Sequence, residues 1–183
     1  MPKRSDRTLK YICNNIDDVV QIIDLIQPMD MVVFNGELLV MRDAAQKRLI
    51  QIFNSNKKLP VSLKNKIVFY AGPSRTPPNF VIGSIGPTTS ARMDKYLDFL
   101  YSNGVIATVG KGPRTKKAIE LTKKYKKTYF ITLSGAAALL SKMIIDYEVL
   151  AFQELGPEAI ARIKVKNFPM IVAINSFGKT TFE

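Results

Sequence analysis

Cationic side chains stand at three places where an apolar, strand-like run gives way to a helix-like one. Arg42 follows the run ELLVM, Lys111 follows VIATV, and Arg92 comes two residues after the hydroxyl run TTS (88–90). An arginine can bind a carboxylate through two parallel hydrogen bonds, whereas a lysine supplies a compact point charge. Two arginines and one lysine, if the fold brings them together, would suit a small organic dianion.

The hydroxyl run TTS allows two interpretations. In open α/β sheets, ligands bind beyond the carboxyl ends of the strands, where the free N–H groups of a helix's first turn attract anions. One of the three hydroxyls could equally serve as an ordinary helix cap. Arg92 in the first turn opposes the helix dipole by about 0.3–1 kcal/mol, which favours an anion or an acidic neighbour beside it. Asp43 could likewise neutralise the adjacent Arg42, so the charge pattern leaves an anion site and plain capping open.

The composition excludes several kinds of chemistry. The 27 Lys and Arg outnumber the 15 Asp and Glu, and the formal net charge of +12 should attract anions. There is one cysteine, Cys13, and no histidine. These counts rule out a Cys/His zinc site, a Ser-His or Cys-His catalytic pair, and a set of thiolate ligands for an iron–sulfur cluster. We therefore expect no metal-binding or cofactor-binding residues in this chain.

The length of 183 residues is enough for one domain with a sizeable core. We expect a single domain over residues 1–183, with residues 1–30 as an N-terminal arm or helix. The sequence has neither an apolar stretch long enough to cross a bilayer nor the apolar segment of a secretory signal. Together with the lone Cys13, this predicts a cytoplasmic protein without a membrane partner.

The elements that must position the charged residues alternate between helix and strand. Asn15 should cap a helix over IDDVVQIIDLI, Asn35-Gly36 should form the tight turn of a hairpin, and another helix should begin near Asp43. Apolar runs at 67–71 and 80–85 indicate strands. Further along we expect helices over 90–103, 115–125, 135–143 and 157–162, and strands over 105–109, 128–133, 147–152, 163–165 and 170–174.

This order of elements predicts the fold class. Strands that alternate with helices favour an α/β fold in which at least part of the sheet is parallel. The early hairpin and the terminal strands predict an additional antiparallel layer. We therefore expect a mixed sheet with a parallel core.

Several motifs resemble one known family. GPTTSARMD (86–94), preceded by RDAAQKRL (42–49) and followed by KGPR (111–114), resembles the β subunit, or C-terminal domain, of the class I fumarate hydratase and L-tartrate dehydratase family. The likeness extends from about Met31 onward, and GPTT-x-x-RMD is its most specific signal. It continues in the same order through SGAAALL (134–140), ELGPEAI (154–160) and NFPMIVAINSFG (167–178).

The resemblance implies a three-layered β/β/α domain of the swivelling type. It also implies an oxygen-sensitive hydro-lyase that reversibly hydrates fumarate to L-malate, or dehydrates a related hydroxy-dicarboxylate such as tartrate. In that family a four-iron four-sulfur cluster is held by three cysteines of a partner α subunit or N-terminal domain, with one iron left open. The open iron acts as a Lewis acid on the hydroxyl group of the substrate. The β subunit closes over the cluster and binds the carboxylates, and we expect it to be inactive without its partner.

The family roles can be carried over to individual residues. The resemblance implies that Arg42, Arg92 and Lys111 hold the C4 dicarboxylate, and that Thr88 lies beside the carbon that loses or gains the proton. A threonine hydroxyl is a poor base, so Thr88 should work together with a carboxylate of the α subunit. Gln46 replaces a histidine that is common in the family, which bears on the choice of substrate more than on the reaction class.

Two other functions remain as alternatives. One is a non-catalytic, basic nucleic-acid-binding protein that exploits the charge of +12. The run KKYKK (123–127) lacks the interleaved aromatic residues of a single-strand binding platform, so we interpret it as a solvated face and do not expect nucleic acid as the partner. The other is a scaffold that keeps the fold and forms a complex without turnover.

Overall fold

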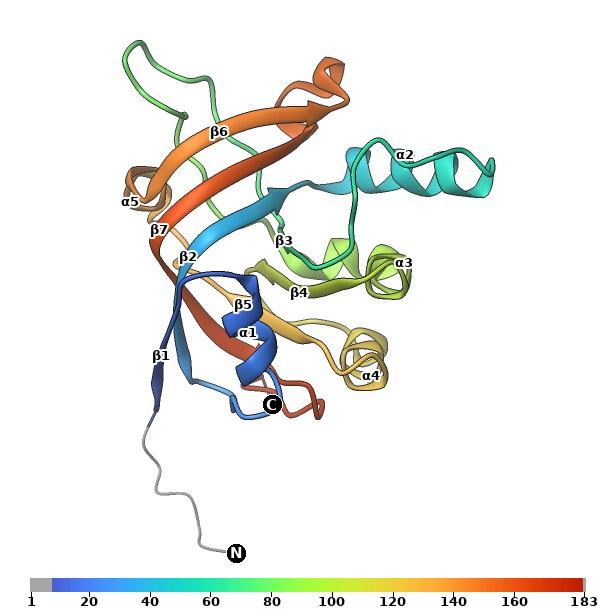
Figure 1. The fold of residues 1–183 in the computed structure, drawn as a ribbon, viewed down its shortest axis with the longest axis vertical. Helices are drawn as coiled ribbons and strands as arrows, with labels where there is room; N and C mark the ends of the chain where they lie inside the picture. The colour runs from blue at the N-terminus through green and yellow to red at the C-terminus, as the bar shows by residue number, and fades with distance from the viewer. Residues whose placement is uncertain (1–7, 183) are drawn as a thin grey trace, which may run out of the picture.

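A computed structural model describes residues 8–182 of the chain. These residues form seven strands of one mixed sheet, with helices packed against it (Figure 1). In chain order the elements are β1 (Lys10–Cys13), α1 (Ile16–Ile22), β2 (Met31–Val40), α2 (Asp43–Asn54), β3 (Lys66–Phe69), the 3-10 helix η1 (Ser90–Tyr96), α3 (Leu97–Ser102), β4 (Val105–Gly110), α4 (Lys116–Lys124), β5 (Thr128–Ile131), α5 (Ala137–Lys142), β6 (Ile144–Ala151), the 3-10 helix η2 (Gln153–Glu158) and β7 (Ile160–Ile174).

The strand pairing confirms an α/β fold with a mixed sheet. The strand order is β1-β2-β3-β4-β5-β7-β6, and the first five strands run parallel to one another. Strand β7 is antiparallel to each strand that it pairs with, β5, β6 and β2. Because β7 also pairs with β2, the five strands β2, β3, β4, β5 and β7 close into a ring.

Two apolar clusters lie on opposite faces of these strands. Successive side chains of a strand point to opposite faces, so Phe69 of β3 belongs to the inner cluster and its neighbour Val68 to the outer one. The inner cluster includes Phe168 of β7, whose ring meets that of Phe69 edge to face at 5.5 Å. The outer cluster lies between the sheet and helices α2, α3 and α4, which cover one side of the sheet in Figure 1.

The predicted hairpin at Asn35-Gly36 is wrong. Strand β2 runs through both residues, and the two halves of the strand pair with β7 from Met31 to Val40. The register shifts between Phe34 and Gly36, and Gly36 has a φ of 148°. Asn-Gly therefore forms a β-bulge that bends one long strand, because pairing with β7 outweighs the local preference for a turn.

The predicted strand over 80–85 is also wrong. This segment has no ladder partner, although Ile82 and Ile85 are buried in the inner cluster. Gly83 lies so close to the preceding loop that an added Cβ would come within 2.2 Å of the carbonyl oxygen of Ser74. The apolar residues of this segment thus indicate a buried loop. Hydrophobic periodicity alone cannot distinguish such a loop from a buried strand.

The chain's last elements differ from the prediction as well. The two expected terminal strands form the single strand β7, whose register with β2 is interrupted near Asn167, a residue with a φ of 55°. The helix expected over 157–162 ends at Glu158, because residues from Ile160 onward pair with β6 and β2. Long-range pairing again decides where the strand begins.

The predicted helix starts are confirmed where a capping residue marks them, although α1 ends at Ile22 and not at Ile26 as expected. Asn15 accepts a hydrogen bond from the backbone of Asp18 at the start of α1, and Thr115 does the same for Ala118 in α4. The helix expected over 90–103 closes near Gly104, whose φ of 92° suits a helix end, but its first half is the 3-10 helix η1.

The predicted N-terminal arm is described from residue 8 onward. Residues 8–30 contribute β1, which pairs with β2, and the short helix α1. Residues 1–7 of the predicted arm lie outside the described residues. Within residues 8–182, no helix has the length and apolar character that crossing a membrane requires.

Candidate functional site

The carboxyl ends of three parallel strands meet at one edge of the sheet. Val40 of β2 pairs with Phe69 of β3, which in turn pairs with Val109 of β4. Neighbouring strands lie about 4.8 Å apart, so residues that follow adjacent strands remain close. Arg42 comes two residues after the end of β2, and Lys111 comes directly after β4. Two of the predicted site residues therefore flank the end of β3.

The hydroxyl run crosses this same edge. The backbone N–H of Thr88 donates to the carbonyl of Tyr70, just beyond β3, at 2.7 Å. Thr89 forms a parallel bridge with Lys111, and the N–H of Ser90 donates to the Lys111 carbonyl at 3.0 Å. Thr88 is half-buried, and its hydroxyl has no hydrogen-bond partner among residues 8–182. It is therefore available to a ligand at the end of β3.

Arg92 joins the group through an ion pair. Its Nη2 lies 3.2 Å from Oδ2 of Asp43, the first residue of α2. The Arg92 side chain is 55% exposed. The structure thus places Thr88, Arg92, Lys111 and Arg42 at one edge of the sheet. Their roles in binding and catalysis stay a prediction.

Arg42 is held by a carboxylate that the sequence analysis did not single out. Its Nη2 lies 2.9 Å from Oε1 of Glu158, while Oε2 of Glu158 accepts the N–H of Ala44 at 3.0 Å. The interpretation that Asp43 neutralises Arg42 is therefore wrong, because Asp43 pairs with Arg92. The guanidinium lies against Gly72, where an added Cβ would come within 3.0 Å of Cζ. Glu158 belongs to the motif ELGPEAI, which was a signal without an assigned role.

Lys111 differs from the two arginines. Its side chain is half-buried, and its ammonium group forms no ion pair with any residue from 8 to 182. Three cations and two carboxylates, Asp43 and Glu158, gather at this edge, so the formal charges leave one positive charge unbalanced. Lys111 carries that charge, which makes it the cation best placed to attract an anion.

The helix start expected at residue 90 is not α-helical. The element that begins there is a seven-residue 3-10 helix, η1, and Thr89 before it makes no side-chain capping bond. The N–H of Ser90 is already used by the Lys111 carbonyl. Thr89 is therefore not a side-chain cap of η1, and an anion site at this helix start stays a prediction.

A buried ion pair beneath the edge was missed by the sequence analysis. Asp94 of η1 pairs with Arg114, and both residues are 8% exposed. The other Asp94 oxygen accepts the N–H and the hydroxyl of Thr115, at 2.8 and 2.7 Å. These bonds fasten the segment that carries Arg92 to the loop that carries Lys111. The signal lay in the motifs RMD and KGPR, which contain Asp94 and Arg114.

Buried aromatic residues surround the Arg114 guanidinium. Its carbon Cζ lies 4.8 Å from the ring centre of Tyr129 and 5.5 Å from that of Tyr70. The Tyr129 hydroxyl lies 3.0 Å from Oγ of Ser90 and 2.8 Å from the Gly112 carbonyl. Burial raises the pKa of Tyr129 to about 12, although the Ser90 hydrogen bond and the Arg114 charge act in the opposite direction. Tyr129 is therefore a neutral hydrogen-bonding group near pH 7.

Comparison with known proteins identifies the family. The family described as Fumarase C-terminus matches residues 2–183. The chain belongs to the fumarase C-terminus family. This confirms the resemblance found in the motifs GPTTSARMD, RDAAQKRL and KGPR.

Individual relatives of this family differ in length. Fumarate hydratase 2 of Leishmania major is 36% identical over 170 residues, which cover 92% of this chain and 30% of that protein. The anaerobic class I fumarate hydratase of Escherichia coli K12 is 36% identical over 81% of this chain and 27% of its own length. A Methanocaldococcus jannaschii protein, provisionally named L(+)-tartrate dehydratase subunit beta, is 38% identical over 84% of this chain and 82% of its length. The chain thus spans less than a third of the length of these two fumarate hydratases.

Gln46 occupies a position near Arg42 in this family member. Its backbone N–H donates to the Arg42 carbonyl at 3.1 Å, one helical turn away. The side chain is fully buried, and neither amide atom has a hydrogen-bond partner among residues 8–182. The Nε of Arg42 is likewise buried without a partner. Hydrogen-bonding groups of Gln46 and Arg42 are therefore unused at the start of α2 among the described residues.

The described residues of this family member do not fit an iron–sulfur cluster. Among residues 8–182 no three His, Cys, Asp or Glu side chains are grouped so that they could hold a metal ion. Cys13 is buried in β1, and burial, with a smaller contribution from Asp18, raises the pKa of its thiol to about 11. One protonated thiol cannot supply the thiolate set that such a cluster needs.

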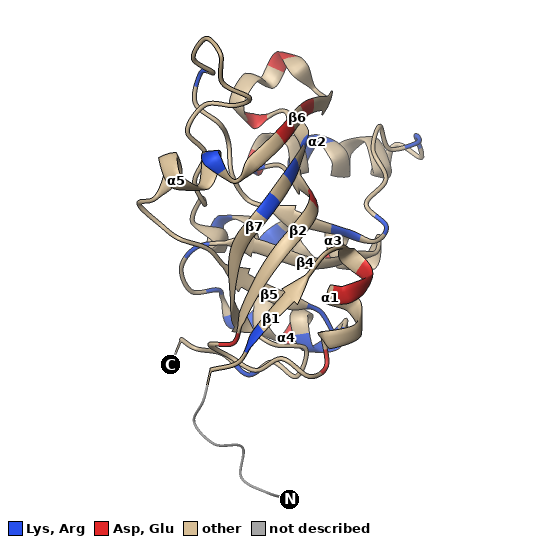
Figure 2. Cartoon of the chain, turned by 60° about the vertical axis from the view of Figure 1, so that its left-hand side comes forward, with Lys and Arg blue, Asp and Glu red and all other residues tan. Residues whose placement is uncertain are grey.

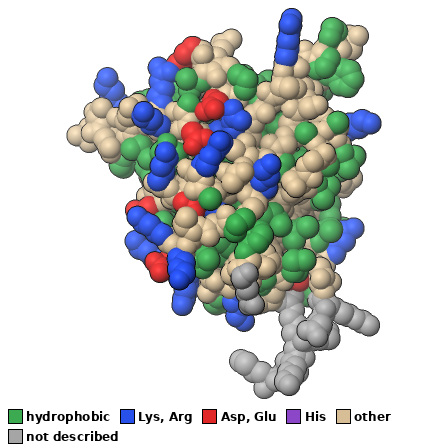
Figure 3. Space-filling view, turned by 180° about the vertical axis from the view of Figure 1, so that it is seen from behind, with side chains coloured by type: hydrophobic (Ala, Val, Ile, Leu, Met, Phe, Trp, Pro, Cys, Tyr) green, Lys and Arg blue, Asp and Glu red, His purple; other side chains and the backbone are tan. Residues whose placement is uncertain are grey.

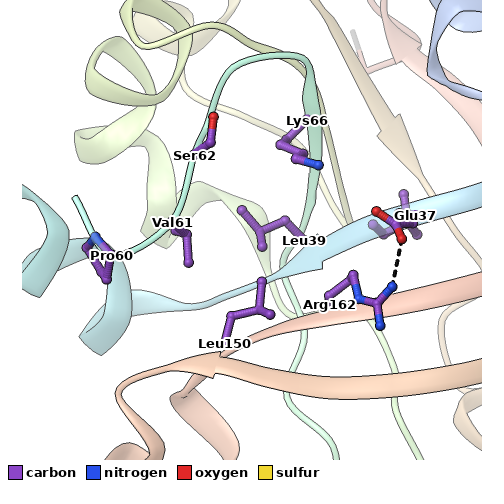
Figure 4. A pocket seen from close by; sticks show the side chains of 9 residues that line it. Glu37, Leu39, Pro60, Val61, Ser62, Lys66, Leu150 and Arg162 are labelled. Carbon is purple, nitrogen blue, oxygen red and sulfur yellow. Dashed lines mark hydrogen bonds and ion pairs between the residues drawn. The ribbon is translucent and has the colours of Figure 1, made fainter. Parts of the chain in front are cut away.

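A cavity of about 310 Å³ lies beside the start of β3 (Figure 4). It is bordered by Leu39 and Glu37 of β2, Lys66 at the start of β3, and Arg162 of β7. Arg162 already pairs with Glu37 at 2.7 Å, as the dashed line in Figure 4 marks. None of the four predicted site residues lines this cavity.

The basic surface residues are spread over the molecule. In Figure 2 the Lys and Arg positions are distributed over β7, β1 and several loops, with acidic positions on α1 and β6. From behind, basic side chains on one half of the surface alternate with acidic ones (Figure 3). Within KKYKK, Lys123, Lys124 and Lys126 are exposed, as expected of a solvated face, while burial lowers the pKa of the half-buried Lys127.

Proposed function

We propose that this chain is the β subunit of an iron–sulfur-dependent hydro-lyase. The reaction is the reversible hydration of fumarate to L-malate, or the dehydration of a related hydroxy-dicarboxylate such as tartrate. The observation that carries the proposal is the gathering of Arg42, Arg92 and Lys111 at one sheet edge in a member of the fumarase C-terminus family. The relatives' names supply the reaction class.

The three cations would hold the two carboxylates of a C4 substrate. Each guanidinium has five N–H donors, and the ion pairs with Glu158 and Asp43 use one edge of each. The remaining donors of Arg42 and Arg92 can bind a substrate carboxylate. Lys111 adds the unbalanced positive charge, so a dianion would bind better than a monoanion.

Thr88 would lie beside the carbon that exchanges a proton. Hydration adds a hydroxyl group to one carbon of the double bond and a proton to the other. A neutral hydroxyl is a poor base, so Thr88 would donate a hydrogen bond to a carboxylate of the partner subunit that takes the proton, or accept one from the protonated carboxyl group that delivers it. Its free hydroxyl and its fixed backbone at the end of β3 suit that positioning role.

We propose that the four-iron four-sulfur cluster lies on a separate α subunit. The lengths of the relatives support this, because the chain matches less than a third of two fumarate hydratases and most of a protein named as a beta subunit. The proposal includes the finer fold description, a three-layered β/β/α domain of the swivelling type. The closed ring of strands and the outer layer of helices support this description. It also includes a cytoplasmic location, in keeping with an oxygen-sensitive enzyme.

Anaerobic co-expression with the iron–sulfur subunit tests the proposal. The purified complex should hydrate fumarate or dehydrate tartrate, and this chain without its partner should do neither. Arg92→Ala and Thr88→Ala should each lower kcat/KM by about 100-fold or more, because both act on the bound substrate. Lys124→Ala, on the exposed end of α4, is the matched control. A cluster-loaded complex that converts no C4 dicarboxylate would refute the proposal.

The same preparation tests the nucleic-acid alternative. That function predicts affinity for DNA or RNA that falls steeply with salt and survives Arg92→Ala. The hydro-lyase predicts that any such affinity is weak and unrelated to the site. Titration with DNA at two salt concentrations separates the two functions. The scaffold alternative predicts a stable complex without turnover.

A further inference from the structure

Ser90 connects the two segments that carry the predicted substrate-binding residues Arg92 and Lys111. It is the first residue of η1, and its side chain is fully buried. Its Oγ lies 3.2 Å from the Lys111 backbone nitrogen, which donates to it, while its own N–H donates to the Lys111 carbonyl at 3.0 Å. One residue therefore holds both backbone polar groups of Lys111.

Tyr129 extends this connection from the opposite side. Its hydroxyl lies 2.8 Å from the Gly112 carbonyl and 3.0 Å from Oγ of Ser90. A carbonyl can only accept, so the single Tyr129 proton goes to Gly112, and the Ser90 proton then goes to the Tyr129 oxygen. The result is a continuous chain of hydrogen bonds from the Lys111 N–H through Ser90 and Tyr129 to Gly112. Every group in it is satisfied.

The close approach of Ser90 depends on a glycine. A Cβ placed on Gly110, the last residue of β4, would come within 1.9 Å of Oγ of Ser90. No side chain larger than hydrogen fits there while Ser90 keeps its position. Gly112, on the other side of Lys111, has a φ of 78°. Glycines on both sides of Lys111 therefore allow the backbone conformation in which Ser90 bonds to Lys111.

We propose that Ser90 is a positioning residue that fixes the direction in which Lys111 presents its ammonium group to the dicarboxylate. The inference rests on the proposed function, because it assumes that Lys111 binds substrate. Ser90 acts through the backbone of Lys111 and does not touch the substrate. Tyr129 supports it by fixing the orientation of the Ser90 hydroxyl.

The fold leaves room to test this role without unfolding the chain. Asp94 also fastens η1 to the 111–115 loop through Arg114 and Thr115. Ser90→Ala should therefore loosen the alignment of Lys111 while the two segments remain joined. Ser176 is a matched control, because it is 2% exposed and its hydroxyl bonds to Asp24 at 2.8 Å, after the end of β7.

The test compares variants within the complete complex with the α subunit. Ser90→Ala should raise KM for fumarate about fivefold to tenfold and leave kcat within about twofold, because substrate binding is affected more than the chemical step. Gly110→Ala, which displaces Ser90, should do the same, and Tyr129→Phe should have a smaller effect in the same direction. Ser176→Ala should leave KM unchanged.

A second measurement separates this inference from the proposed function. Hydrogen exchange at the Lys111 amide, read in the complex whether or not it turns over substrate, should be about tenfold faster in Ser90→Ala and unchanged in Ser176→Ala. An inactive wild-type complex would refute the proposed function. Unchanged exchange, or an unchanged KM in an active Ser90→Ala complex, would overturn the positioning role.

Discussion

The β2–β7 ladder and the candidate site edge are built in different ways. The ladder pairs residues 31–40 with residues 161–171, and its inward-facing apolar side chains, such as Phe34 and Phe168, are fully buried. The site edge is held by a few polar bonds, among them the Asp94–Arg114 pair and the Ser90–Lys111 contacts. Packing energy in the ladder is shared by many residues. Geometry at the site edge depends on single groups, so single substitutions should affect it most sharply.

The buried ion pair at the site edge should give the largest loss of stability. Asp94→Leu leaves Arg114 buried without its partner and removes the acceptor of two Thr115 donors. We expect the free energy of unfolding to fall by about 3–5 kcal/mol. Urea unfolding of the full chain measures this. Lys124→Met, which removes an exposed pair with Asp98 at 3.8 Å, should change it by less than about 1 kcal/mol. Equal effects would contradict the comparison.

A cavity in the ladder should cost slightly less. Phe168 is fully buried and packs against Phe69, so Phe168→Ala should lower the free energy of unfolding by about 3–4 kcal/mol. In the assembled complex KM should stay within about twofold of the wild-type value, since Phe168 belongs to the inner apolar cluster and none of the predicted site residues does. A variant that is stable but has lost substrate binding would argue against the separation of the two regions.

The bulge in β2 should tolerate no side chain. An added Cβ at Gly36 would come within 2.7 Å of the Phe34 ring, and its φ of 148° is unfavourable for other residues. Gly36→Ala should destabilise the chain by about 1–3 kcal/mol in thermal or urea unfolding. Gly156→Ala is the matched control, because Gly156 has a φ of 54° and no atom near its Cβ position. This substitution should lower the free energy of unfolding by about 1 kcal/mol. If Gly156→Ala destabilised the chain as much as Gly36→Ala, the bulge would not be the cause of the effect at Gly36.

Alkaline pH should weaken the site edge through Tyr129. Burial raises its pKa from 10.0 to about 12, so between these values the unfolded chain has released a proton that the folded chain keeps. This stabilisation is complete below pH 10 and is lost as pH rises to about 12, a change of about 3 kcal/mol. Tyr129→Phe should flatten this part of the curve of unfolding free energy against pH. Tyr125→Phe is the control, and an equal flattening there would contradict the assignment.

The sequence predicted those parts of the fold that carry local signals. Asn15 and Thr115 cap their helices, and Gly104 closes one, because a cap is set by a residue and its near neighbours. Asn35-Gly36 and the run 80–85 were misinterpreted, because their conformation depends on distant partners. The bulge is decided by pairing with β7, more than 120 residues away, which no local pattern reveals.

The candidate site was predictable to a similar degree. Arg42 follows β2 and Lys111 follows β4, the two parallel strands on either side of β3, so the α/β order already indicated that their helix entries lie at one edge of the sheet. Glu158 lies 116 residues from Arg42, and Tyr129 lies 39 residues from Ser90. Their contribution could not be predicted, because a contact between distant residues leaves no mark in spacing or composition. The roles of the predicted residues stay a prediction until the complex is assayed.

Competition between two four-carbon acids tests the central claim most directly. Succinate carries two carboxylates and butyrate one, so three converging cations should bind succinate at least about 100-fold more tightly. In the active complex, inhibition of fumarate hydration should show this ratio, and Lys111→Met should reduce it to about tenfold or less. Equal inhibition by the two acids, or a ratio that Lys111→Met leaves unchanged, would contradict a dianion site built from Arg42, Arg92 and Lys111.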